Sequence, residues 1–280
     1  MKKIVAIFFS VLMLLGCFAG CSQDKESNAT KAPEATNVGN SDWEYIKNKG
    51  ELIVGITLFA PMNYEDDKGE LTGFETEFAR AVGEKLGVSV KFQVIDWNAK
   101  VTELDSKAID CIWNGMTITD ELKEKLEISN PYMANKQVVV VKAENVDKYT
   151  DALTINGAIA VAENGSAGEI VASTNEIFSG ANFTAVQAQA NVLMEVLSGT
   201  ADLGIIDYVM SIGSIGQGTD YADLTTVQSL EFNPEEYGIA FRKGSDAVEK
   251  VNTAMSELAS DGTLNEIAAK YKLQDLLLVK

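Results

Sequence analysis

Polar residues follow the end of an apolar run at several points of this 280-residue sequence, and these residues are the best placed for chemistry. The first segment is Asn114 to Thr119, which follows a run ending at Trp113. Its asparagine and threonine side chains and its backbone amides can form hydrogen bonds with a zwitterion. Because ligands of open α/β sheets lie outside the carboxyl ends of the strands, we predict a binding loop here. Thr119 is also suited to cap a helix starting at Asp120.

A second segment, Glu163 to Glu169, follows the apolar run Ala158 to Ala162. Ser166 and Glu169 have the spacing of a capping box, which indicates the start of a helix. The free amides of a helix start suit an anion. The Ser166 hydroxyl is equally suited to a plain cap, whereas the amides keep their anion-binding role in both cases.

Asp207 is the third candidate, because it ends the apolar run Leu203 to Ile206. A carboxylate at the carboxyl end of a buried strand is placed to meet a ligand. The alternative is that Asp207 caps the helix that follows. We favour the binding role.

Composition excludes several functions. The formal charge of −18 gives nucleic-acid binding almost no electrostatic support. The sequence has no His, which excludes His-based catalysis and His metal ligands, and we predict no metal and no cofactor. The sequence is 46% hydrophobic and 23% charged, as expected of a globular protein of one or two domains.

The N-terminus predicts export. A basic start is followed by the apolar run Ile4 to Ala19, which is too short to span a membrane and is typical of a signal peptide. Small residues before Cys21 resemble the bacterial lipobox, so we predict a lipoprotein signal peptide over 1–20 and lipidation of Cys21, with Cys17 as the weaker alternative. Residues 21–41 are polar and predict a flexible tether. Cys111 lies in a strand-like run and is expected in the core.

The remaining sequence alternates between strands and helices, which predicts an α/β fold with mostly parallel sheets. Strands are predicted at 52–56, 88–95, 110–113, 137–141, 158–162, 183–186, 203–206 and 237–241. Helices are predicted at 74–86, 101–106, 120–126, from 168, around 192–196, at 248–258 and from a Thr263–Glu266 capping box. Residues 130–137 and 231–237 are the expected connections between two lobes.

From about Gly50 to Lys272 the sequence resembles the extracytoplasmic solute-binding proteins of amino-acid ABC transporters, bacterial family 3. The matching motifs include GELIVG from Gly50, GELTGFETEFA from Gly69, DCIWNGMTIT from Asp110, SNPY from Ser129 and YGIAFRKG from Tyr237. The resemblance implies a two-lobe periplasmic-binding-protein-like fold of type II with two hinge strands. Lobe 1 then comprises 42–136 and 232–280, and lobe 2 comprises 137–231.

The resemblance also implies roles for individual residues. Asp207 takes the ligand's α-ammonium group, the Ser166 region holds its carboxylate, Phe59 stacks on it, and Trp97 forms a wall. Trp113 is a weaker candidate for the wall, since an aromatic residue at the end of a strand is more often part of the core. The full predicted set is Phe59, Trp97, Asn114, Gly115, Met116, Thr117, Thr119, Gly165, Ser166, Ala167 and Asp207.

Two positions depart from the family pattern. Leu122 stands where the family usually has an Arg that clamps the α-carboxylate, and Ile56 or Thr57 stands where many members have an Asp. Lys100 and Lys136 are candidates to replace the missing cation, although each is more simply a solvated surface charge. Alternatively, the ligand has no free α-carboxylate.

The predicted function is therefore a lipid-anchored, monomeric, extracytoplasmic receptor without enzymatic activity. It binds a small polar solute, most simply an amino acid, and delivers it to ABC permease subunits. The alternative is an enzyme on the same fold, such as a small-acid dehydratase, with Glu163 or Asp207 as acid–base groups.

Overall fold

The computed structural model describes residues 41–230 and 232–279. The predicted signal peptide, Cys17, Cys21 and all but the last residue of the predicted tether lie outside the described residues. That last residue, Ser41, accepts a hydrogen bond from the Glu44 amide and caps the first helix. Within the described residues no helix is both long and apolar enough to cross a membrane.

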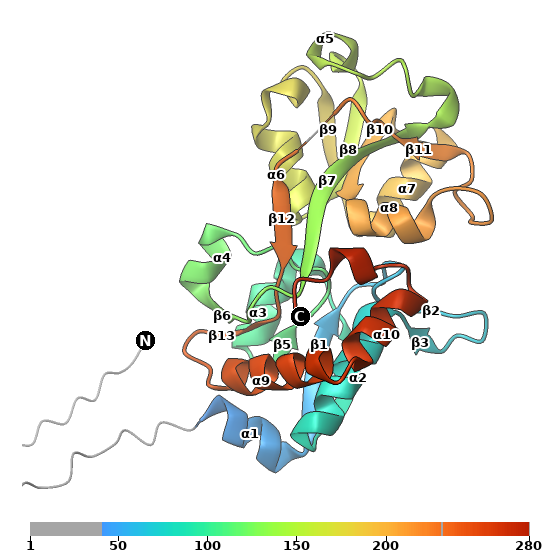
Figure 1. The fold of residues 1–280 in the computed structure, drawn as a ribbon. Helices are drawn as coiled ribbons and strands as arrows, with labels where there is room; N and C mark the ends of the chain where they lie inside the picture. The colour runs from blue at the N-terminus through green and yellow to red at the C-terminus, as the bar shows by residue number, and fades with distance from the viewer. Residues whose placement is uncertain (1–40, 231, 280) are drawn as a thin grey trace, which may run out of the picture. The chain divides into compact units, whose positions relative to one another are not determined.

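The first lobe is a five-stranded sheet with the order β4-β1-β5-β13-β6 (Figure 1). The strands are β1 (Glu51–Ile56), β4 (Ser89–Val94), β5 (Cys111–Ile112), β6 (Leu126–Ile128) and β13 (Ala240–Arg242). β1 pairs in parallel with β4 and β5, and only β13 runs antiparallel to its neighbours β5 and β6. The lobe's helices are α1 (Asp42–Lys49), α2 (Phe74–Leu86), α3 (Lys100–Asp105), α4 (Asp120–Lys125), α9 (Ala247–Ser260) and α10 (Thr263–Lys270). Its smaller elements are β2 (Tyr64–Glu65), β3 (Leu71–Thr72), η1 (Trp97–Ala99) and η4 (Gln274–Leu276).

The second lobe repeats this arrangement with the strand order β11-β7-β10-β8-β9. The strands are β7 (Met133–Lys142), β8 (Ile159–Glu163), β9 (Asn182–Val186), β10 (Leu203–Asp207) and β11 (Leu224–Thr226). Here β7 is the strand that runs antiparallel to its neighbours. The helices are α5 (Ala152–Ile155), α6 (Ala167–Thr174), α7 (Gln189–Ser198) and α8 (Tyr208–Ser214), with short turns η2 (Ala143–Asn145) and η3 (Glu176–Phe178). The predicted mostly parallel sheets are confirmed, and the exceptional strand of each lobe is the one that the chain forms after crossing from the other lobe.

Two strands connect the lobes. β7 leaves the first lobe and β12 (Pro234–Tyr237) returns to it, and the two pair antiparallel from Met133–Tyr237 to Lys136–Pro234. Figure 1 shows this pair bridging the two lobes. The paired segments, 133–136 and 234–237, fall within the two connections that the sequence predicts, whereas β7 continues beyond its connection to Lys142.

The apolar face of α2 packs into the core of the first lobe. Phe74 and Phe78 are fully buried and pack with Trp113 and Tyr132, with ring centroids 5.0 to 6.5 Å apart. Trp113 therefore belongs to the core, and Cys111, two positions earlier, is buried as expected. Gly87 ends α2 with φ +71°, a conformation that glycine adopts without strain.

One local prediction is wrong. The Thr263–Glu266 capping box does not form, because α10 begins at Thr263 itself and its N-cap is Gly262. The Thr263 amide instead donates to the Asp261 side chain at 3.0 Å. The preceding acid thus takes the capping role that the pattern gives to the threonine.

Candidate ligand-binding site

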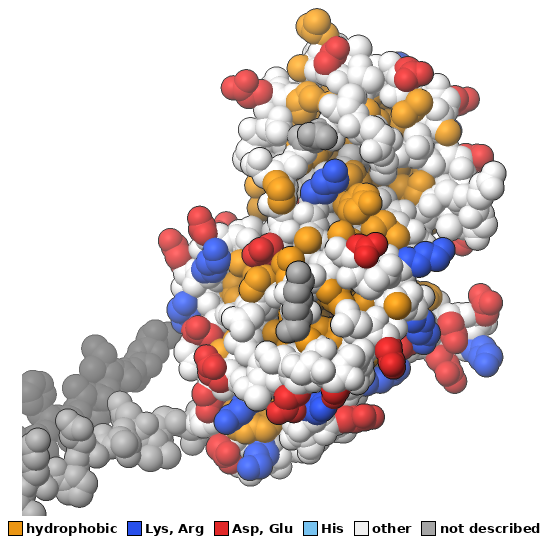
Figure 2. Space-filling model, in the orientation of Figure 1, with side chains coloured by type: hydrophobic (Ala, Val, Ile, Leu, Met, Phe, Trp, Pro, Cys, Tyr) orange, Lys and Arg blue, Asp and Glu red, His pale blue; other side chains and the backbone are white. Residues whose placement is uncertain are grey.

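A cavity of about 400 Å³ lies between the two lobes, and both lobes line it. Ten of the eleven predicted ligand-binding residues line it, namely Trp97, Asn114, Gly115, Met116, Thr117, Thr119, Gly165, Ser166, Ala167 and Asp207. Phe59 is not among the lining residues. In Figure 2 charged side chains of both signs are scattered over both lobes, and hydrophobic side chains gather at the level where the lobes meet.

The ring of Phe59 packs against the backbone of Gly115. Gly115 has φ +56°, and a Cβ atom there would lie 2.8 Å from the Phe59 ring. Phe59 is buried directly against the loop backbone, so its packing supports the loop. A ligand role for Phe59 remains a prediction.

The loop's backbone is held by a buried acid that sequence reasoning missed. Glu75, in the first turn of α2, accepts hydrogen bonds from the Gly115 amide at 2.7 Å and from the Tyr132 hydroxyl. Asn114 is fixed as well, because its amide nitrogen donates to Thr57 at 2.6 Å. Burial raises the pKa of Glu75 to about 7. No local pattern distinguishes Glu75 from the other acids of α2.

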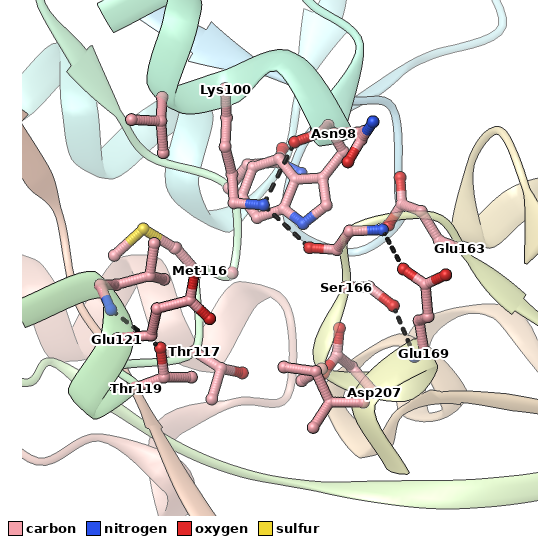
Figure 3. Close-up of a pocket in the computed structure, with 18 of the residues that line it drawn as sticks. Asn98, Lys100, Met116, Thr117, Thr119, Glu121, Glu163, Ser166, Glu169 and Asp207 are labelled. Carbon is pink, nitrogen blue, oxygen red and sulfur yellow. Dashed lines mark hydrogen bonds between the residues drawn. The ribbon is translucent and has the colours of Figure 1, made fainter. Parts of the chain in front are cut away.

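Thr119 and Leu122 form one corner of the cavity. Thr119 is the N-cap of α4 and its hydroxyl accepts a hydrogen bond from the Leu122 amide at 3.2 Å (Figure 3). The capping role is therefore confirmed, and Thr119 lines the cavity at the same time. Leu122 also lines it, so an apolar side chain occupies the place expected for the family's arginine.

Lys100 corrects a sequence prediction. It is not a solvated surface charge: only 8% of it is exposed and it lines the cavity. Its ammonium donates to the carbonyl oxygens of Trp97 at 3.2 Å and of Gly165 at 2.8 Å, and it lies 4.7 Å from the centre of the Trp97 ring. Figure 3 shows it reaching across from the first lobe toward the second.

Burial lowers the pKa of Lys100, and the nearby Glu163 opposes that shift. The other candidate, Lys136, lies over the Tyr208 ring and is not among the residues that line the cavity. The buried cation of this cavity is therefore Lys100.

The start of α6 forms the opposite wall. The Ser166 hydroxyl accepts a hydrogen bond from the Glu169 amide at 3.2 Å, and Glu169 in turn accepts one from the Gly165 amide at 2.6 Å. The reciprocal bond thus reaches one residue earlier than in a standard capping box. The first amides of a helix have no intrahelical acceptor, so this wall offers N–H donors to an anion.

Asp207 is buried at the carboxyl end of β10, with 4% exposed. Its carboxylate accepts hydrogen bonds from the side-chain amides of Asn135 and Gln137, each at 2.6 Å, and from Gln189. Burial raises its pKa to about 6, and these hydrogen bonds oppose the rise. Its side chain does not cap α8, which removes the capping alternative.

Two α/β lobes joined by a strand pair around a polar cavity define a two-lobed ligand-binding protein. The chain belongs to the bacterial extracellular solute-binding proteins, family 3, whose model matches residues 52–274. The resemblance read from the sequence is confirmed.

Known relatives agree with this assignment. The L-cystine-binding protein TcyJ of Escherichia coli is 29% identical over 228 residues, covering 81% of this chain and 84% of the relative. The L-cystine-binding protein TcyA of Bacillus subtilis is 28% identical and covers 98% of both chains. A histidine-bound substrate-binding protein of an ABC uptake transporter from Streptococcus pneumoniae superposes with a TM-score of 0.76. It is 30% identical and covers 85% of this chain and 99% of its own. These relatives are named as binding proteins, which supports a receptor and not the dehydratase alternative.

Proposed function

We propose that this protein captures an amino acid between its lobes and delivers it to the permease of an ABC transporter. One observation carries the proposal: a single interlobe cavity places a buried carboxylate, Asp207, together with a buried ammonium, Lys100, and a helix start. Such a set complements the two charges of a zwitterion. The names of the relatives, which bind cystine and histidine, support the same class of solute.

The proposed binding mode assigns each end of the zwitterion to a group. Asp207 receives the α-ammonium group, because its carboxylate is held in place by three amides. The carboxylate meets the first amides of α6 and the ammonium of Lys100. Lys100 thus takes the role of the arginine that the family usually has at the position of Leu122. In this mode the ligand keeps a free α-carboxylate.

Delivery requires the ligand-bound and ligand-free states of the protein to differ in structure. Two lobes on a two-stranded connection are suited to hinge closure around a ligand. Lys100, on the first lobe, donates to the Gly165 carbonyl on the second, so the lobes in this structure are in contact beside the cavity. We further propose that the protein acts as a monomer and is held at the membrane by two acyl chains on Cys21.

Calorimetry tests the proposed function. A chain that begins after residue 20 is purified and titrated with the proteinogenic amino acids and L-cystine, after native mass spectrometry for any co-purified solute. At least one amino acid should bind, raise the melting temperature and reduce the radius of gyration in solution scattering. The absence of binding by every amino acid contradicts the proposal. Binding without a change in scattering contradicts the hinge.

A further inference from the structure

Glu163, at the carboxyl end of β8, is a cavity-lining acid that the binding mode above leaves without a partner. Only 2% of it is exposed, and its Oε1 atom makes no hydrogen bond within residues 41–230 and 232–279. Burying an ionised carboxylate without a partner is costly, so buried acids are normally paired or bonded. A buried, unpaired acid in a binding cavity therefore points to a group supplied by the ligand.

The charged groups that face Glu163 do not supply that partner. They are Asp207, Lys100 and Asp96. Asp207 is an acid, and Asp96 is an acid already bonded to the Asn98 amide at 2.9 Å. Lys100 is the base, but its ammonium donates to two carbonyl groups and, in the proposed mode, to the ligand's carboxylate.

Counting charges gives the same result. Among the described residues, Glu163, Asp207 and Lys100 are the buried charged groups that line the cavity, and with all three ionised these buried groups sum to one negative charge. A neutral amino acid is a zwitterion with no net charge, so it leaves this excess in place. A ligand with one additional cationic nitrogen neutralises it.

We propose that Glu163 binds a second cationic nitrogen of the ligand, so that the solute is an amino acid whose side chain carries a protonated amino or guanidino group. This inference rests on the proposed function and narrows it from amino acids in general to this class. L-Lysine and L-arginine belong to this class. L-Cystine also carries a second ammonium group, which a second carboxylate accompanies, so it offers Glu163 a cationic nitrogen without adding net charge.

Proton linkage supplies a signature of this pairing. Burial, followed by the charge of Asp207, raises the pKa of Glu163 to about 8 in the ligand-free cavity. A cation bound against Glu163 lowers that pKa, so binding releases a proton near neutral pH. Affinity for the cationic ligand should therefore rise as the pH rises toward about 8.

Matched ligands test the inference. L-Lysine is compared with L-norleucine, which lacks only the side-chain ammonium, and L-arginine with its neutral analogue L-citrulline; L-cystine is titrated separately. Each is titrated into the wild type, into Glu163→Gln and into Glu124→Gln, which removes an exposed acid of α4 outside the cavity lining. Titrations in buffers of different ionisation enthalpy count the protons released.

We expect at least one cationic member to bind at least about 30-fold more tightly than its neutral analogue, or L-cystine to bind at least about 30-fold more tightly than any amino acid that carries a single ammonium group. Glu163→Gln should abolish this preference and the proton release, whereas Glu124→Gln keeps both. The melting temperature of ligand-free Glu163→Gln should equal or exceed that of the wild type, since the change removes a buried unpaired acid. A loss of binding then does not reflect unfolding.

Three results would overturn the inference, and they separate it from the proposed function. If neutral amino acids bind best and Glu163→Gln leaves their affinity unchanged, the inference fails and the proposed function stands. If Glu163→Gln weakens cationic and neutral ligands equally, Glu163 assists Asp207 at the α-ammonium and the assignment of a second cation is wrong. If no amino acid binds, the proposed function fails and this inference fails with it.

Discussion

Removing the ammonium of Lys100 is the sharpest perturbation of the proposed site. Lys100→Met keeps an unbranched apolar side chain of similar length beside Trp97, but it loses the hydrogen bonds to the Trp97 and Gly165 carbonyls at 3.2 and 2.8 Å. The bond to Gly165 joins the two lobes, and a hydrogen bond to a charged group contributes about 1.5–3 kcal/mol. Losing one partner of a buried charge pair with the ligand costs about 2–5 kcal/mol.

Affinity for the bound amino acid should therefore fall by at least about 30-fold, measured by calorimetry. Lys136→Met is the matched control, because Lys136 is not among the residues lining the cavity and its loss should leave affinity unchanged.

A charge relocation sharpens the test. Leu122 lines the same cavity, so Leu122→Arg added to Lys100→Met returns a cation to it. The double variant should recover about 10-fold in affinity if the ligand presents a free carboxylate. Wild-type affinity in Lys100→Met alone would refute the reasoning, because the ligand's carboxylate would then need no side-chain cation.

Three further predictions concern the second lobe, pH and the anchor. Asp207→Asn should weaken binding by about 30-fold or more in the same titration, because it removes the charge that faces the α-ammonium, and unchanged affinity would remove Asp207 from the site. Burial raises the pKa values of Asp207, Glu75 and Glu163 to about 6, 7 and 8, above their values in an unfolded chain. The contribution of these carboxyl groups to the stability of the folded protein is complete below their pKa of about 4 in the unfolded chain. It is lost as the pH rises through their pKa values in the folded protein, so the melting temperature of the ligand-free protein should fall between about pH 5 and 8. Glu163→Gln should flatten the upper part of that fall, and an identical profile contradicts the pKa assignment. Cys21→Ser should move the full chain from the membrane fraction to the soluble fraction, and retention after a salt wash argues against lipidation.

The fold and the cavity-lining loops were accessible from sequence because both depend on short patterns. Apolar runs identify the strands, and the carboxyl-end rule then places Asn114–Thr119, Ser166 and Asp207 at the same edge of their sheets without any knowledge of packing. The prediction for Phe59 rests on the family resemblance alone, and in the structure its ring packs against Gly115, outside the residues that line the cavity.

The electrostatics of the site were not accessible in this way. Lys100 is buried because the Gly165 carbonyl, 65 positions away in the sequence, comes within 2.8 Å of its ammonium. Glu75 is buried because the Gly115 amide and the Tyr132 hydroxyl converge on it from two other segments. Such environments arise only when separate elements pack together, and a charge in a polar segment of sequence is more often solvated.

The hinge and the site share one hydrogen-bond network, which links ligand binding to closure. Glu235 of β12 accepts hydrogen bonds from Thr117 of the first lobe at 3.1 Å and from Gln137 of β7 at 3.0 Å. Gln137 also donates to Asp207, so the carboxylate proposed for the ammonium is positioned by a strand that crosses between the lobes. In the proposed mode the other end of the ligand meets Lys100 on the first lobe. The second lobe supplies Asp207 and the first amides of α6, whereas only the first lobe supplies Lys100. An open protein therefore offers only part of the site, and the ligand stabilises the closed form by the contacts that it gains there alone.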